Sequence, residues 1–289
     1  MKTIAILLTV YNRKIKTLSC LNSLNNLQPS DEPQAIDIYM VDDNSTDGTS
    51  EAVSERYPDT RIICGSGNLF WNRGMHTAWM EASNEKDYDY YLWINDDTVF
   101  FKSSLNVLLS TSSQFDDEKI IVGSTCATSN PAIITYGGRD SRGKLISPQA
   151  SPLKCDFFNG NIVLIPRFVF LKVGMNDPYF RHALGDFDYG RRAAKFAVQS
   201  IIAPNILGEC DEHESLSTWC DPDEPFSKRW KAFRSPLGHN PEEFFVYEKR
   251  HNGIINACFH YITNHLRVFF PQVWKHRNMQ TLNCKAPLS

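Results

Sequence analysis

The sequence lacks any run of about 18 uninterrupted apolar residues, the length that a membrane-spanning helix requires. Its first ten residues are too few for a secretory signal peptide and lack the small-residue cleavage pattern. The eight cysteines form no CxxC pair and no other zinc-ligand spacing. We therefore expect reduced thiols in a cytoplasmic protein.

Glycine-rich phosphate-binding loops are also missing. No GxGxxG motif follows the first apolar run, and no GxxxxGK[ST] motif occurs in the sequence. Their absence counts against dinucleotide-binding and P-loop NTPase chemistry. The composition, 42% hydrophobic and 22% charged residues in a chain of 289, is that of a globular protein with one large domain or two small ones.

Charge is unevenly distributed along the chain. Residues 226–289 contain ten Lys or Arg against three Asp or Glu, whereas the preceding 225 residues contain 20 against 30. A basic tail on an acidic body favours an anionic partner for the tail, such as phosphate groups or a lipid surface. A solvated basic face without a partner is the alternative.

Four apolar runs of strand length occur in the first hundred residues, at 4–10, 36–41, 61–64 and 91–94. Helical patterns separate them, so successive strand-loop-helix units predict a parallel sheet. Ligands bind at the carboxyl edge of such sheets. Polar residues stand at that predicted edge: Thr9, Tyr11, Asp42, Asp43, Asn68, Asp96 and Asp97.

The fourth run stops abruptly at Asn95-Asp96-Asp97-Thr98. Oxygen-rich clusters suit Mg²⁺ or Mn²⁺, so the two adjacent carboxylates are a candidate metal site. A second interpretation stays open, in which Asp97 or Thr98 caps a helix that begins near Ser103.

The second half of the chain predicts further strands at 120–124, 162–165 and 198–203, the last ending at Pro204, and an irregular segment at 141–152. Between the last two strands, Asp186 and Asp188 open a predicted helix. The helix dipole stabilises carboxylates at this end, and simple N-capping explains the same pattern.

The segments Thr9-Val10-Tyr11-Asn12-Arg13, Val41 to Thr49 and Asn95-Asp96-Asp97-Thr98 resemble three successive motifs of family 2 glycosyltransferases. Gly67 to Met75 resembles the rhamnosyltransferase-like bacterial branch, which builds surface polysaccharides. The resemblance covers residues 3 to about 215.

This resemblance implies an α/β GT-A fold, with a Rossmann-like, mostly parallel central sheet flanked by helices. We expect a catalytic domain at 1–225, with its nucleotide-binding half at about 1–100 and its acceptor-binding half at about 101–225. A basic, amphipathic helical extension at 226–289 follows.

The resemblance also implies a nucleotide site for a UDP- or dTDP-sugar. Thr9 and Tyr11 would line the base pocket, and Asp43 would accept from the base N3–H, because a carboxylate is a pure acceptor. Asp42 would support the loop. Further expected nucleotide contacts are Arg13, Asn68, Arg73 and Asp96.

The expected metal ligand is Asp97, which would hold Mn²⁺ or Mg²⁺ against the diphosphate, with Asn95 standing where the family has an acidic residue. A late histidine, His213, is a second expected ligand.

Asp186 falls at the family's catalytic-base position, with Gly185 in place of the usual Glu. Sugar or acceptor contacts are expected from Asn159, Gly160, Asn161 and Asp188. The implied reaction is inverting transfer to a hydroxyl of a glycan or lipid-linked acceptor.

Two other functions stay open, a non-catalytic nucleotide- or sugar-binding homologue and a sugar-1-phosphate nucleotidyltransferase. We expect no nucleic-acid partner. Apolar residues from 248 to 270 recur at helical spacing and predict one amphipathic helix. This helix would pack on the catalytic domain, form a homodimer, or bind an anionic membrane surface, with the protein peripheral on the inner face of the plasma membrane.

Overall fold

The structure is a computed structural model that describes residues 1–28, 33–211 and 218–272. The chain forms two compact units, Met1–Glu212 and His213–Ser289. The sequence analysis placed its domain boundary at 225/226, and its assignment of functions to the two parts stays a prediction. The seven cysteines within the described residues are free thiols.

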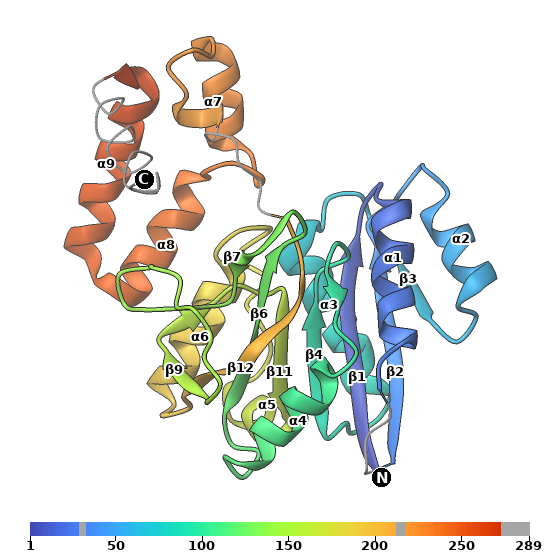
Figure 1. The fold of residues 1–289 in the computed structure, drawn as a ribbon. Coiled ribbons are helices and arrows are strands. Elements are labelled where there is room, and N and C mark those ends of the chain that lie inside the picture. The colour runs from blue at the N-terminus through green and yellow to red at the C-terminus, as the bar shows by residue number, and fades with distance from the viewer. Residues whose placement is uncertain (29–32, 212–217, 273–289) are drawn as a thin grey trace. The chain divides into compact units, whose positions relative to one another are not determined.

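The described part of the first unit is built on a mixed ten-stranded sheet with the order β3-β2-β1-β4-β11-β6-β12-β5 (Figure 1). Strand β7 pairs with β6, and β9 pairs with β12. The strands of this sheet are β1 (Lys2–Val10), β2 (Gln34–Asp42), β3 (Arg61–Cys64), β4 (Tyr90–Ile94), β5 (Val99–Phe100), β6 (Ile120–Ala127), β7 (Asn130–Tyr136), β9 (Leu153–Cys155), β11 (Ile162–Pro166) and β12 (Ser200–Glu209). Two further strands, β8 (Gly138–Arg139) and β10 (Phe157–Phe158), pair separately.

Strands β1 to β4 run parallel, so their carboxyl ends meet at one edge. Strand β11 runs antiparallel between β4 and β6 and brings the segment before Ile162 to the same edge. This mixed, mostly parallel sheet confirms the predicted fold class.

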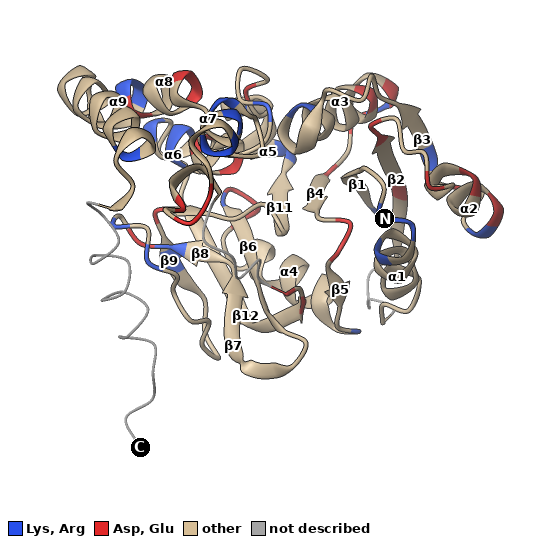
Figure 2. Cartoon of the chain, turned by 90° about the horizontal axis from the view of Figure 1, so that it is seen from above, with Lys and Arg blue, Asp and Glu red and all other residues tan. Residues whose placement is uncertain are grey.

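Helices cover both faces of the sheet, as the continuous burial of β1 from Ile4 to Val10 requires. Ile4, Ile6 and Leu8 belong to a core with α1, α2 and α4, whereas Ala5 and Leu7 belong to a core with α3, α5 and α6. Figure 2 shows α3, α5 and α6 on one side of the strands and α1 and α4 on the other. The helices are α1 (Lys14–Asn25), α2 (Thr49–Arg56), α3 (Phe70–Glu85), α4 (Ser104–Ser113), α5 (Arg167–Val173) and α6 (Gly185–Lys195).

One predicted strand end is wrong. Strand β12 does not stop at Pro204 but continues to Glu209. Its pairing with β6 shifts register between Ile202 and Ile206, and this irregularity accommodates a residue that has no N–H to donate.

The second unit contains a short 3₁₀ turn, η1 (Thr218–Cys220), and the helices α7 (Phe226–Arg234), α8 (Pro241–Asn252) and α9 (Ile254–Phe269). The prediction of one continuous helix from 248 to 270 is wrong, because the chain breaks at Gly253, whose φ of +89° is a left-handed conformation that favours glycine. Within the described ranges no helix is long and apolar enough to cross a membrane.

We predict that Trp79 is the most costly side chain of α3 to truncate. It is fully buried, and its ring contacts Trp93, Tyr91 and Tyr189 at centroid distances of 5.3–5.7 Å. Trp79→Ala should lower the free energy of unfolding by about 3–5 kcal/mol in urea titrations. Met80→Ala, on the same helix but 39% exposed, should cost less than about 1 kcal/mol. Equal losses in the two variants would contradict this assignment of the core.

Candidate active site

The carboxyl edge of the sheet gathers most of the predicted site residues. The first connection joins the loops after β1 and β2. The Ser45 hydroxyl accepts from the Asn12 N–H (2.9 Å), and Asn12 Oδ1 accepts from the Thr46 N–H (2.7 Å). Asp42 accepts from the Ser45 N–H (2.8 Å) and from the Ser50 hydroxyl. The buried Asp42 carboxylate therefore stabilises the loop that follows β2.

Asp43 anchors the segment that leads into α3. Its Oδ1 accepts from the Gly67 N–H (2.7 Å), and its Oδ2 accepts from the N–H groups of Leu69 and Phe70 (both 2.9 Å). A Cβ on Gly65 would lie 2.7 Å from Asp43 Oδ1, so this close approach requires glycine. Three of about four lone-pair positions on the carboxylate are occupied, which leaves room for one further donor.

Other predicted nucleotide residues differ in their accessibility. The ring of Tyr11 is 57% exposed at the edge, and Asn68 is exposed as well. Thr9 is only 9% exposed and faces α3, where a Cβ on Gly74 would lie 2.2 Å from its Oγ1. The Arg73 guanidinium donates through Nε to the Pro178 carbonyl (2.8 Å). Of this group, Tyr11 presents the larger surface to a ligand.

Asp96 and Asp97 lie in the acidic loop between β4 and β5, which Figure 2 shows among the strand ends. Arg13 Nη1 is 3.2 Å from Asp96 Oδ1 and 2.7 Å from Asp97 Oδ2, and Lys16 Nζ is 3.7 Å from Asp97 Oδ2. Burial raises the pKa of Asp96 to about 7, although Arg13 opposes the shift. The two side chains are 8% and 9% exposed, so these cations offset the cost of burying adjacent negative charges.

The acidic loop fits a divalent cation that is bound partly by these carboxylates and partly by the phosphates of a substrate. Asp96 Oδ2 is buried without a hydrogen-bond partner, and Asp97 Oδ1 accepts from the Cys210 thiol at 3.5 Å. The described residues contain no group of three or more His, Cys, Asp or Glu side chains arranged to hold a metal. Mg²⁺ characteristically binds through one or two carboxylates together with substrate phosphates. His213 lies outside the described residues.

Asn95, which stands where the family resemblance has an acidic residue, holds an indole ring. Trp71 Nε1 donates to Asn95 Oδ1 at 2.8 Å, and the Trp71 ring packs edge-on against Trp93 at a centroid distance of 6.0 Å. The six-membered part of the Trp71 ring covers Gly160, where an added Cβ would lie 2.5 Å from Cζ2 and Cη2 of the ring. Trp71 therefore joins the loop after β4 to the loop before β11.

Asp186 lies directly beside Gly160. Its Oδ2 accepts from the Gly160 N–H (2.9 Å), and its Oδ1 accepts from the Phe187 N–H (2.8 Å). Burial raises the pKa of Asp186 to about 6, while these backbone hydrogen bonds oppose the shift. A carboxylate with this pKa is ionised near neutral pH and basic enough to accept a proton.

The preceding residue, Gly185, has a steric reason to lack a side chain. A Cβ at this position would lie 1.9 Å from Oδ1 of Asn72, and Asn72 is fully buried. Asn72 donates to the carbonyls of Asp177 (2.8 Å) and Phe180 (2.7 Å), which fixes it in place. A glutamate here would collide with Asn72.

The remaining predicted sugar contacts are engaged within the protein. Asn159 Oδ1 accepts from Arg139 Nε (2.9 Å), and Asn161 Nδ2 donates to the Cys210 sulfur (3.5 Å). Asp188 is fully buried, and its Oδ2 is 2.9 Å from Arg192 Nε. Both residues lie on α6, and Arg192 also donates to the carbonyls of Val173 (3.3 Å) and Met175 (2.6 Å), so Asp188 supports the contact of α6 with the end of α5.

The sequence analysis did not select Trp71, Cys210 or His182 as site residues. The backbone N–H of Trp71 donates to His182 Nδ1 at 3.5 Å. Burial, together with the nearby Arg13, lowers the His182 pKa to about 4. His182 is therefore a neutral imidazole at the edge of the site. Trp71 lies inside the Gly67 to Met75 segment, which resembles the rhamnosyltransferase-like branch, whereas no local pattern marks His182 or Cys210.

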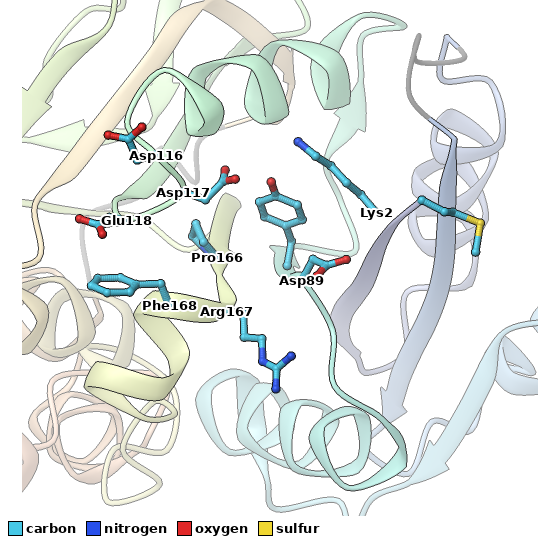
Figure 3. Close-up of a pocket in the computed structure, with 10 residues that line it drawn as sticks. Lys2, Asp89, Asp116, Asp117, Glu118, Pro166, Arg167 and Phe168 are labelled. Atoms are coloured by element: carbon cyan, nitrogen blue, oxygen red, sulfur yellow. The ribbon is translucent and has the colours of Figure 1, made fainter.

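A cavity of about 350 Å³ lies elsewhere, at the opposite ends of the strands (Figure 3). Lys2, Asp89 and Pro166 line it together with the loop residues 116–118. Lys2 begins β1 and Pro166 ends the antiparallel β11, so the cavity is on the amino-end edge of the sheet. It contains none of the predicted site residues.

The chain is similar in sequence to known proteins. The family model described as "Glycosyl transferase family 2" matches residues 5–164. The chain is 22% identical over 250 residues to the N-acetylglucosaminyl-diphospho-decaprenol L-rhamnosyltransferase of Mycobacterium tuberculosis, covering 75% of this chain and 76% of that protein.

Solved structures resemble the chain in fold. The S. aureus TarS 1–349 structure has a TM-score of 0.55 at 13% identity, covering 100% of this chain and 76% of TarS 1–349. The mannosyltransferase PcManGT from Pyrobaculum calidifontis, in complex with GDP-Man and Mn²⁺, has a TM-score of 0.54 at 15% identity, covering 99% of this chain and 76% of that one.

We predict that Asn95 and Trp71 are energetically coupled. Asn95→Ala leaves the indole N–H without its acceptor and should lower the free energy of unfolding by about 1–3 kcal/mol. Trp71→Phe removes the donor. Because both changes remove the same hydrogen bond, the double variant should lose less stability than the two single losses added together, by about 1 kcal/mol. Urea titrations of the four proteins measure this difference, and strictly additive losses would contradict the coupling.

Proposed function

The chain belongs to glycosyltransferase family 2, which transfers sugars from nucleotide sugars, and on this premise we propose an inverting transfer from a UDP- or dTDP-sugar to a hydroxyl of a glycan or lipid-linked acceptor. One observation carries the proposal, a continuous series of contacts from Asp43 to Asp186. Asp43 holds the segment before Trp71, Trp71 binds Asn95 and covers Gly160, and the Gly160 N–H donates to Asp186.

The nucleotide would bind where the loops after β1 and β2 are joined. The exposed ring of Tyr11 offers a stacking surface for a pyrimidine base, and Asp43 retains capacity for one more donor, such as a base imide N–H. Asp42 shapes this site indirectly, because it accepts from the Ser45 N–H within the loop.

The diphosphate would bind beside the acidic loop. Asp97, with Asp96 beside it, would hold Mn²⁺ or Mg²⁺, and the cation would supply charge neutralisation for the leaving diphosphate. Arg13 and Lys16 lie within 4 Å of Asp97 and would contact phosphate oxygens as well. These residues would place positive charge on the leaving-group side of the reacting carbon.

Asp186 would accept the proton of the attacking acceptor hydroxyl. The Gly160 and Phe187 N–H groups hold its carboxylate, and its pKa of about 6 keeps it ionised at neutral pH. The hydroxyl oxygen would attack the anomeric carbon from the side opposite the diphosphate, which inverts the configuration. Asn159, Gly160 and Asn161 would shape the sugar and acceptor site, with Asp188 supporting the contact of α6 with the end of α5.

The two departures from the family pattern are compatible with catalysis. Asn95 binds Trp71, and Gly185 is required by the proximity of Asn72. Each residue thus has a structural reason in this chain, which favours an enzyme over a non-catalytic binding protein. The similarity to an N-acetylglucosaminyl-diphospho-decaprenol rhamnosyltransferase supports a lipid-linked acceptor and assembly of a bacterial surface polysaccharide.

We predict that Asp186→Asn lowers kcat/KM by about 100-fold or more, because a general base contributes roughly that factor. Release of nucleotide from UDP- and dTDP-sugars measures the rate. In the unchanged protein, kcat/KM should rise with pH, with a midpoint near 6, because the base must be deprotonated. Asp37→Asn is the control, since Asp37 pairs with Lys86 and Tyr88 instead. A folded Asp186→Asn protein with near-normal turnover would remove this base from the mechanism.

We also predict that the reaction depends on a divalent cation. EDTA should abolish nucleotide release, and added Mn²⁺ or Mg²⁺ should restore it, because Asp97 would bind the cation that neutralises the diphosphate. Asp97→Asn should raise the Mn²⁺ concentration that gives half-maximal activity, whereas Asp37→Asn should leave it unchanged. Full activity in EDTA would refute the cation's role.

A further inference from the structure

Helix α9 turns its largest apolar side chains toward solvent. It buries Ala257 and Val268, whereas six larger apolar residues are exposed, Ile254 (51%) and five that follow it. We call these last five the apolar stripe: Ile255 (82% exposed), Phe259 (61%), Ile262 (59%), Leu266 (44%) and Phe269 (49%). A surface helix normally buries such residues, and a large exposed apolar patch marks an interaction site.

The spacing of the apolar stripe places it along one side of the helix. Successive members are four, three, four and three residues apart, so they form a single line along a helix that is about 24 Å long. The line extends onto α7, because the Phe269 ring stacks on Phe226 at a centroid distance of 5.3 Å. Phe226 is 44% exposed and continues the apolar surface.

Apart from the contacts of Phe269 with Phe226 and Trp230, the ring contacts within the second unit use a different side of α9. Tyr261 packs edge-on against Phe245 of α8 (5.8 Å), and His265 packs edge-on against Phe233 of α7 (4.9 Å). Gly253 allows the chain to turn between α8 and α9, so that the two helices form a pair (Figure 1). The unit is therefore held together without burying the apolar stripe.

The charge of this region identifies the kind of surface that suits the stripe. From Lys249 to Ser289 the sequence contains six Lys or Arg and no Asp or Glu, whereas the first 248 residues contain 24 Lys or Arg against 33 Asp or Glu. An anionic surface would attract the C-terminal region and repel the rest of the chain. Two copies that met through α9 would instead bring two cationic segments together.

We propose that the apolar stripe of α9 binds the surface of an anionic phospholipid bilayer. Its Phe, Ile and Leu side chains would enter the boundary between headgroups and acyl chains, while cations of the C-terminal region would contact the headgroups. The helix would lie in the plane of the surface. This inference extends the proposed function, because a bilayer surface is where a lipid-linked acceptor resides.

Flotation of the full-length protein with vesicles tests this proposal. Vesicles of phosphatidylcholine with 30% phosphatidylglycerol should carry the protein upward, and binding should fall at least fivefold on vesicles of phosphatidylcholine alone or at 0.5 M NaCl. Phe259→Asp and Ile262→Asp should each reduce binding to anionic vesicles at least tenfold. Leu171→Asp is the matched control, because Leu171 is 69% exposed on helix α5 of the first unit. This variant should bind anionic vesicles as well as the original protein does.

Several outcomes would overturn the proposal. Unchanged flotation of Phe259→Asp, or no flotation of the original protein, would show that α9 is not the lipid-binding element. A dimer that Phe259→Asp converts to a monomer, without any flotation, would assign the stripe to a second copy. Circular dichroism would show that the variants are folded. The experiment contains neither donor nor acceptor, so its failure leaves the proposed transfer reaction intact, and failed nucleotide release leaves vesicle binding intact.

Discussion

The candidate site depends on the position of one indole ring. Trp71 donates its Nε1–H to Asn95 at the end of β4 and covers Gly160 before β11 with the six-membered part of its ring. A small residue is obligatory at 160, where the backbone N–H donates to Asp186. The Trp71 ring therefore contacts both the acidic loop and the segment that holds the proposed base.

Packing behind the site supports this arrangement. Trp71 meets Trp93, Trp93 meets Trp79, and Trp79 meets the buried ring of Tyr189 on α6. The same helix carries Asp186 at its first turn, and Arg192, paired with Asp188, donates to the carbonyls of Val173 and Met175 at the end of α5. The core that holds α3 against the sheet also holds α6 in place. The stability of this core and the geometry of the candidate site are therefore linked.

The parts of the fold that were predicted from sequence are those encoded by local patterns. Each apolar run that ends in polar residues became a strand with a polar carboxyl end, and Asp43 and Asp96 were selected on that basis together with the family resemblance. Asp186 was selected at the start of a predicted helix, again together with the resemblance. The pair formed by Trp71 and Asn95 could not be found this way, because the two residues are 24 positions apart. His182 and Cys210 were missed for the same reason, and the turn at Gly253 was missed because an apolar pattern continues across it.

The cations around the acidic loop have a consequence for how ligands arrive. Arg13 and Lys16 already neutralise much of the charge on Asp96 and Asp97. A divalent cation approaching alone would meet these positive side chains, and a diphosphate approaching alone would meet the carboxylates. Only a cation and a diphosphate together satisfy both sets of charges. In the proposed reaction, the metal–nucleotide complex would therefore be the species that the site selects, and binding of each component would strengthen binding of the other.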